Sequence, residues 1–270
     1  MGCFQSRGAD SKANRIARWR STGIVALRDA KLKTFPDEVL DLDRSVRTLD
    51  LTHNKLVEIP MDISNLVNMQ RLILATNLIE RLPINLGKLQ ALKVMILDGN
   101  QITSLPDELG QLVRLEKLSI SGNMLMSLPE TIGSLRNLSL LNVSNNKLKY
   151  LPESVGSCFS LEELQANDNL IEELPASVCN LVHLKSLCLN NNKISQMEGF
   201  QEFEARRKKK FDKQIDSNVM IGSKGLDEVL IYNSAAFTVL LLNRLDNGYI
   251  SSTTSDIKER GLDSLLVFFV

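Results

Sequence analysis

The chain contains few of the residues that build catalytic and metal sites. Its 270 residues include two histidines, His53 and His183, and none of its four cysteines is paired at metal-ligand spacing. No nucleophile elbow, phosphate-binding loop or zinc-protease motif occurs along the sequence. Because the usual sequence signatures of enzymes and metal sites are absent, we expect no catalytic activity, no cofactor and no metal.

Long apolar runs and an excess of one charge are also missing. The formal net charge is zero, and no apolar signal-peptide core stands near the start, so we expect a reducing compartment and free thiols. The stretch LIYNSAAFTVLLL, residues 230–242, is shorter than a typical membrane-spanning helix. This stretch and the final LLVFFV have three open interpretations: a small extra element, a loose segment or a membrane contact.

What the chain has instead is an asparagine at every 23rd position of an apolar frame. Apolar residues stand eight, five and three positions before each asparagine and two and five positions after it. The frame matches L-x-x-L-x-L-x-x-N-x-L, whose period is typical of stacked repeats. A degenerate first unit, TGIVALRDAKLKTFPDEVL, has Ala30 in place of the asparagine. The seven asparagines are Asn54, Asn77, Asn100, Asn123, Asn146, Asn169 and Asn192.

The repeat predicts a fold in which each coil is completed by its neighbours. The L-x-L step before each asparagine alternates as a short strand does, and the proline that follows in six units disfavours helix before it. A second apolar pair forms the outer wall, and stacking buries a continuous core. We predict an α/β-type solenoid, a leucine-rich repeat horseshoe of about eight 23-residue coils with parallel strands on its concave side.

The repeated asparagines are interpreted as structural. An amide among leucines costs free energy unless its hydrogen bonds are made. Because the amide both donates and accepts, it can bond backbone groups that the turn leaves unpaired. Cys158 stands where other units have leucine, so we predict that it packs in the core.

Function is expected on the concave face, where alternate strand residues point outward. Ile73, Val94 and Ile96 would form an apolar patch flanked by Arg71 and Lys117, which suggests a protein-binding site. Incidental surface hydrophobicity is the alternative. The predicted partner-binding residues are Asp50, Arg71, Ile73, Val94, Ile96, Lys117, Asn142 and Gln165.

The N-terminus predicts a lipid anchor. MGCFQS matches the myristoylation pattern M-G-x-x-x-S at Gly2, and Cys3 is suited to palmitoylation. Stable attachment needs a second signal, which Cys3 and the basic residues of this arm would supply. Trp19 also suits a membrane interface. The alternative is an unmodified flexible terminus.

We divide the chain into four parts: a flexible, basic, lipidated arm (1–21), the solenoid (22–198), a C-terminal capping helix (199–216) and an atypical tail (217–270). The run RRKKK, residues 206–210, indicates a solvated helix face or a membrane-surface patch. Nuclear import or nucleic-acid contact is the alternative, which no nucleic-acid motif supports.

The repeats, the Met-Gly start, the first coil TGIVALRDAKLKTFP and the segment FEARRKKKFDK resemble the intracellular, Ras-group-related leucine-rich repeat proteins. The resemblance covers about residues 1–228 and implies a small intracellular scaffold, peripheral to a membrane and without catalytic activity. Wider relatives engage small GTPases or their effectors through the concave face. The tail beyond Glu228 departs from the family.

These features predict a non-catalytic interaction scaffold in intracellular signalling, tethered by N-terminal acylation at the cytoplasmic face of a membrane. Its partner would be a protein of unknown identity, with a small GTPase or an effector as candidates. We expect no nucleic acid and no small-molecule substrate. The alternative is a soluble nuclear or ubiquitin-ligase-type substrate adaptor without membrane attachment.

Overall fold

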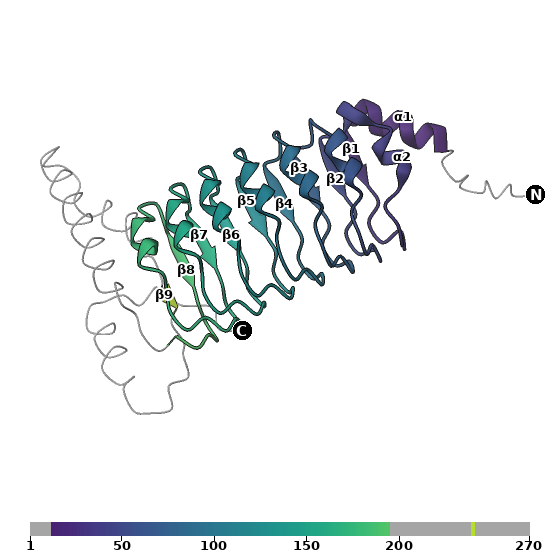
Figure 1. The fold of residues 1–270 in the computed structure, drawn as a ribbon. Helices are drawn as coiled ribbons and strands as arrows, with labels where there is room; N and C mark the ends of the chain where they lie inside the picture. Colours follow the sequence, from purple (N-terminus) through teal and green to yellow (C-terminus); the bar gives the residue numbers. More distant parts are fainter. Residues whose placement is uncertain (1–11, 195–238, 241–270) are drawn as a thin grey trace, which may run out of the picture.

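A computed structural model describes residues 12–194 and the strand Val239–Leu240 (Figure 1). Coils stand side by side along the chain, each with a short strand on one side and a short helical turn on the other. The predicted capping helix over 199–216 lies outside the described residues. The strands are β1 Ile24–Ala26, β2 Thr48–Asp50, β3 Arg71–Ile73, β4 Val94–Ile96, β5 Lys117–Ser119, β6 Leu140–Asn142, β7 Glu163–Gln165, β8 Ser186–Cys188 and β9 Val239–Leu240.

The strands form one parallel sheet in chain order, which confirms the predicted solenoid. Its register follows the 23-residue frame, so that Leu118 of β5 stands opposite Leu141 of β6. The short strand β9 pairs with Leu187 and Cys188 of β8, so two residues of the apolar stretch 230–242 join the sheet.

The opposite wall consists mainly of 3-10 turns. Each turn from η2 to η7 follows a proline, whose fixed φ suits an extended residue just before a turn. Each of the turns η2 to η7 spans five residues, because a coil of 23 residues has no room for a longer helix. The helical elements here are α2 Asp37–Leu40, η1 Asp43–Ser45, η2 Met61–Asn65, η3 Ile84–Lys88, η4 Asp107–Gln111, η5 Glu130–Ser134, η6 Glu153–Ser157 and η7 Ala176–Asn180.

The core fills the space between the sheet and the turns. The middle residue of each strand from β1 to β8 is fully buried, and the apolar residues of the turns meet these side chains from the other wall. Each such burial contributes about 1.5–3 kcal/mol. Cys158 is also fully buried, and burial raises the pKa of its thiol to about 12, so the thiol stays protonated at neutral pH.

The turns stack too closely for a side chain at some positions. A Cβ added at Gly133 in η5 would overlap the carbonyl oxygen of Ser154 in η6. Glycine at this position therefore lets neighbouring coils approach on the wall opposite the sheet. The sheet and the turns together hold the coils at one repeat distance.

Each repeated asparagine joins its own coil to the coil before it. Asn146 accepts a hydrogen bond on Oδ1 from the Leu125 amide at 3.0 Å and donates from Nδ2 to the Ile120 carbonyl at 2.9 Å, both in the preceding coil. Its Nδ2 also lies 3.0 Å from the Val143 carbonyl of its own coil. The same pattern holds at Asn54, Asn77, Asn100, Asn123, Asn169 and Asn192.

The residue before each of these asparagines has a left-handed backbone. At His53, for example, φ is 57°, and at Asn145 it is 54°. A left-handed turn costs free energy for a residue with a Cβ, and more for the β-branched Thr76 at 56°. The turn brings the following asparagine into the core, where its hydrogen bonds offset that cost.

Helix α1, Lys12–Thr22, closes the N-terminal end of the stack. This corrects the prediction of a flexible arm through residue 21 and of Trp19 at a membrane interface. Trp19 is 3% exposed and packs into the core, with the Arg15 guanidinium 5.1 Å from its ring centre. Lys12 and Arg15 both pair with Glu38 of α2. The reason is that the first coil has no coil before it, and Trp19 covers its apolar edge.

The ladder asparagines predict a specific loss of stability. Asn146→Ala should lower the free energy of unfolding in urea by about 2–3 kcal/mol, because the Leu125 amide and the Ile120 carbonyl lose a buried partner. Asn145→Gly is the matched control, since Asn145 is exposed and glycine accepts its left-handed φ. Equal losses in the two variants would show that the ladder bonds are not the cause.

Candidate functional site

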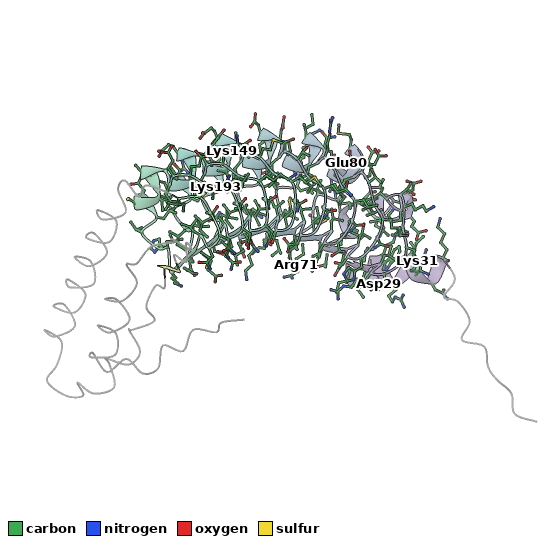
Figure 2. The ribbon with its side chains drawn as sticks, turned by 90° about the horizontal axis from the view of Figure 1, so that it is seen from below. Asp29, Lys31, Arg71, Glu80, Lys149 and Lys193 are labelled. Atoms are coloured by element: carbon green, nitrogen blue, oxygen red, sulfur yellow. The ribbon has the colours of Figure 1, made fainter. Side chains whose placement is uncertain are left out.

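Two columns of side chains stand on the outward side of the sheet, on the concave side of the arc where Figure 2 labels Arg71. They flank the buried middle residue of each strand, as the period of two requires. Parallel pairing aligns them from coil to coil. The first column holds Ile24, Thr48, Arg71, Val94, Lys117, Leu140, Glu163 and Ser186, and the second holds Ala26, Asp50, Ile73, Ile96, Ser119, Asn142, Gln165 and Cys188.

All eight predicted partner-binding residues lie in these columns, with different exposure. Arg71 and Lys117 are exposed. Half-buried positions are occupied by Ile73, Ile96, Asn142 and Gln165. They present part of their surface to solvent while the sheet holds their backbone in place.

Val94 and Asp50 differ from the sequence expectation. Val94 is 8% exposed, because its short side chain stands between the longer Arg71 and Lys117 of the flanking strands. The apolar patch therefore consists of Ile73 and Ile96, with Val94 beneath its edge. Asp50 is 3% exposed and makes its contacts within the chain.

Arg28 covers Asp50. Its Nη2 and Nε lie 2.5 Å and 2.6 Å from Oδ2 of Asp50, and Oγ1 of Thr52 donates to Oδ1 at 2.6 Å. Burial by itself raises the pKa of Asp50, but the hydrogen bonds from Arg28 and Thr52 and the charge of Arg28 outweigh it, so the pKa lies below its usual value. Sequence reasoning missed Arg28 because it belongs to the degenerate first unit. The alignment of the first two units places Arg28 level with Thr52, two residues after Asp50, and this proximity could have indicated the pair.

Two ion pairs near the sheet join neighbouring coils. Lys93 Nζ lies 2.8 Å from Glu116 Oε1, and Lys185 Nζ lies 2.7 Å from Glu162 Oε2. Arg71 and Lys117 form no such pair within residues 12–194. These two cations therefore remain available to a partner.

The C-terminal half of the concave face is rich in amides and hydroxyls. Asn142 Oδ1 accepts from the Ser144 amide at 3.0 Å, and Asn167 Oδ1 accepts from the Asn190 amide at 2.9 Å. Asp98 accepts from the Ser119 hydroxyl at 2.7 Å. These bonds hold the side chains that border the strands, so the face is polar toward this end.

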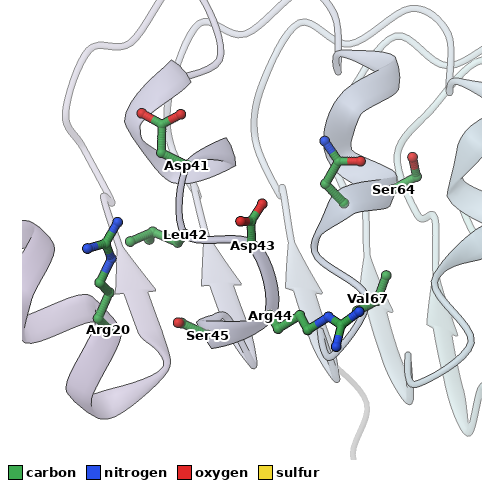
Figure 3. A pocket seen from close by; sticks show the side chains of 9 residues that line it. Arg20, Asp41, Leu42, Asp43, Arg44, Ser45, Ser64 and Val67 are labelled. Carbon is green, nitrogen blue, oxygen red and sulfur yellow. The ribbon is translucent and has the colours of Figure 1, made fainter.

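A recess of about 570 Å³ lies away from these columns, between the end of α1 and the turns η1 and η2 (Figure 3). Charges of both signs line it, from Arg20 and Arg44 and from Asp41 and Asp43. Across the described part of the chain, no cluster of three or more histidine, cysteine or acidic residues could hold a metal ion. The concave face, with its exposed Arg71 and Lys117 beside the half-buried Ile73 and Ile96, is the stronger candidate site.

The predicted lipidation residues, Gly2 and Cys3, lie outside the described residues. Within residues 12–194 and 239–240, no helix has both the length and the apolar character needed to cross a bilayer.

Comparison with known proteins finds three leucine-rich repeat models on this chain. A "leucine rich repeat" model matches residues 44–102, a "leucine-rich repeat region" matches 84–170, and a two-copy model matches 160–202. Plant intracellular Ras-group-related LRR protein 7 of Oryza sativa subsp. japonica is 65% identical over 75 residues. That segment is 28% of this chain and 29% of the rice protein.

Solved structures share the fold. The LRR protein LIC12759 of Leptospira interrogans aligns with a TM-score of 0.54 and 35% identity, over 66% of this chain and 50% of that one. The plant peptide hormone receptor RGFR1, solved in complex with RGF2, aligns with a TM-score of 0.56 and 27% identity, over 61% and 27% of the two chains. This chain thus spans half or less of each relative described.

The Asp50–Arg28 pair predicts a pH-dependent contribution to stability. A carboxylate whose pKa is lowered in the folded state stabilises the fold above its unfolded pKa, about 3.9, and loses that effect as the pH falls through the folded pKa. Asp50→Asn should therefore lower the free energy of unfolding at pH 7 by roughly 1–2 kcal/mol, discounted because Arg28 is 63% exposed. The difference from wild type should shrink below about pH 4.

Urea denaturation from pH 7 to pH 2.5 measures this difference. Asp62→Asn, on an exposed position of η2, is the control and should change little at any pH. A gap for Asp50→Asn that is constant over the whole range would contradict the assignment.

Proposed function

Since this chain carries leucine-rich repeats and is similar to intracellular Ras-group-related leucine-rich repeat proteins, we propose that it is a non-catalytic signalling scaffold. In this proposal a protein partner binds the concave face, and acylation of Gly2 and Cys3 holds the scaffold at the cytoplasmic face of a membrane. Leucine-rich repeat proteins are typically interaction scaffolds without catalytic activity.

The observation that carries the proposal is the set of outward side chains on the concave sheet. Folding buries the middle residue of each strand and the ladder asparagines, and it leaves most of the column residues, Val94 and Asp50 apart, at least partly exposed. Ile73 and Ile96 offer a half-buried apolar centre, and Arg71 and Lys117 offer charge beside it. An apolar centre with a polar rim is the usual composition of a protein interface.

The relatives support a protein as the partner. The structure of the plant peptide hormone receptor RGFR1, which shares this fold, was solved in complex with RGF2. A small GTPase or its effector is the partner class that we propose from the Ras-group-related type.

The tether is supported by the pattern at the N-terminus. Gly2 lies ten positions before Lys12, the first residue of α1, and α1 is fixed to the solenoid through Trp19. Because one myristoyl chain binds a membrane only marginally, Cys3 and the basic residues would supply the second signal. The competing function is a soluble nuclear or ubiquitin-ligase-type adaptor without a tether.

The concave site predicts loss of partner capture on charge insertion. Ile73→Asp with Ile96→Asp should abolish capture by the full-length protein, because both carboxylates would stand in the apolar centre. Met61→Asp with Ile84→Asp is the matched control, since these residues are 53% and 52% exposed on the turns of adjacent coils. Proximity labelling in cells followed by pull-down measures capture. Retained capture by the concave variant would contradict the site.

The tether predicts a change in cellular distribution. Gly2→Ala should move the protein from the membrane fraction to the supernatant, because it removes the acceptor of the myristoyl group. Gly8→Ala keeps the pattern and should remain with membranes. A wild-type protein found wholly in the nucleus or in the supernatant would contradict the tether and favour the adaptor.

A further inference from the structure

Arg71 and Lys117 are two cations that form no ion pair within the part of the chain that the structure describes. Some basic side chains along the sheet meet carboxylates: Arg28 meets Asp50, and Lys93 meets Glu116. Both Arg71 and Lys117 are exposed to solvent. Two exposed cations on either side of an apolar centre point to a partner that brings negative charge.

The register places these cations on either side of an apolar centre. Arg71 on β3 and Lys117 on β5 both flank Val94 on β4, so their Cα atoms are two strand steps apart, about 10 Å at ~4.8 Å per step. Ile73 and Ile96 stand beside them in the second column. A ligand that crosses β3, β4 and β5 meets a cation, an apolar surface and a second cation in that order.

An extended peptide across these strands has a matching spacing. Alternate residues of an extended chain face the same side, and residues four apart lie about 13 Å from each other. Long arginine and lysine side chains can bridge the difference between about 10 Å and 13 Å. Two acidic residues placed two positions before and after an aliphatic residue would therefore meet Arg71, the apolar centre and Lys117.

The other charges within the two columns limit where such a segment can lie. Glu163 on β7 stands in the same column as Lys117, two strands further on, and would repel acidic residues. On the other side, Asp50 on β2 is already paired with Arg28. The acidic segment is therefore confined to β3 through β5. A flat anionic membrane is a poor fit, because a concave wall cannot follow a flat surface.

We propose that the concave face recognises an extended acidic segment of a protein partner, with the pattern acidic-x-aliphatic-x-acidic, over β3 to β5. This inference rests on the proposed concave partner site and specifies the chemistry of its ligand. Arg71 and Lys117 each pair with one carboxylate, and the aliphatic residue packs on Ile73 and Ile96.

The test selects ligands without assuming the partner. Full-length protein is presented with a phage-displayed library of random twelve-residue peptides, and the strongest binders are synthesised with a fluorescent label. Fluorescence polarisation then gives Kd at 50 mM and 500 mM NaCl. Three variants are compared with wild type: Arg71→Glu with Lys117→Glu, Ile73→Asp with Ile96→Asp, and Lys88→Glu with Arg136→Glu. The last pair is exposed, lies outside the strands and changes the net charge equally, so it is the matched control.

The expected result is enrichment of the acidic-x-aliphatic-x-acidic pattern. The Arg71/Lys117 reversal should raise the Kd of these peptides at least tenfold, because both charge pairs with the peptide are lost. The control should change Kd less than about twofold. High salt should weaken wild-type binding several-fold by screening the charges. Selection on the reversed variant should shift the enriched pattern to lysine and arginine.

Two results would overturn the inference in distinguishable ways. Peptides that lose binding in the Ile73/Ile96 variant but keep it in the Arg71/Lys117 variant would leave the concave site in place and refute acidic recognition. Absence of any peptide that depends on either pair would refute the concave site as well. Circular dichroism of each variant establishes that the solenoid remains folded in every comparison.

Discussion

The hydrogen bonds of one asparagine side chain hold each coil to the one before it. The Oδ1 atom accepts from an amide of the preceding coil, and Nδ2 donates to a carbonyl of that same coil and to carbonyls of its own. These groups lie in the turn after the strand, where no sheet ladder pairs them. The asparagine enters this position through a left-handed residue just before it, whose cost the bonds offset. The direction of the bonding also explains the first coil, which has Ala30 where no preceding coil exists to be bonded.

This arrangement separates the residues that fold the chain from those that can bind. The middle strand residues, the turn leucines and the asparagines face inward and are buried. The residues on either side of each middle strand residue remain on the concave surface. Both ends of such a stack need a cover, and α1 supplies it at the N-terminus through Trp19. Helix α1 is thus packed on the stack and leaves the concave surface open to a partner.

Much of this fold was predictable because a fixed period leaves few solutions. The 23-residue frame predicts the strands, their register and the two concave columns, and the parallel sheet confirms the solenoid. Trp19 was assigned to a membrane interface because its sequence neighbours are basic, whereas the uncovered apolar edge of the first coil decides its place. The left-handed backbone of the seven residues that precede the ladder asparagines was not predicted either. Five of these seven residues are glycine, asparagine or aspartate, which was a usable signal, but His53 and Thr76 obscured it.

The candidate site was harder to predict because exposure depends on neighbours across strands rather than along the chain. Val94 is covered because the long side chains of Arg71 and Lys117 happen to flank it, and Asp50 is covered because Arg28 reaches it from the degenerate unit. Periodicity identifies which side of the sheet a residue faces. It does not say which of the outward residues the next coil will shield, and that depends on side-chain length and charge.

Amide hydrogen exchange followed by NMR tests the central claim most directly. The amides of Leu56, Ile79, Ile102, Leu125, Leu148 and Ile171 belong to no strand or helix, and each donates to a ladder asparagine. The account predicts that they exchange as slowly as the buried strand amides, because they open only when neighbouring coils separate. Exchange as fast as that of exposed loop amides would show that the asparagines do not hold the coils together.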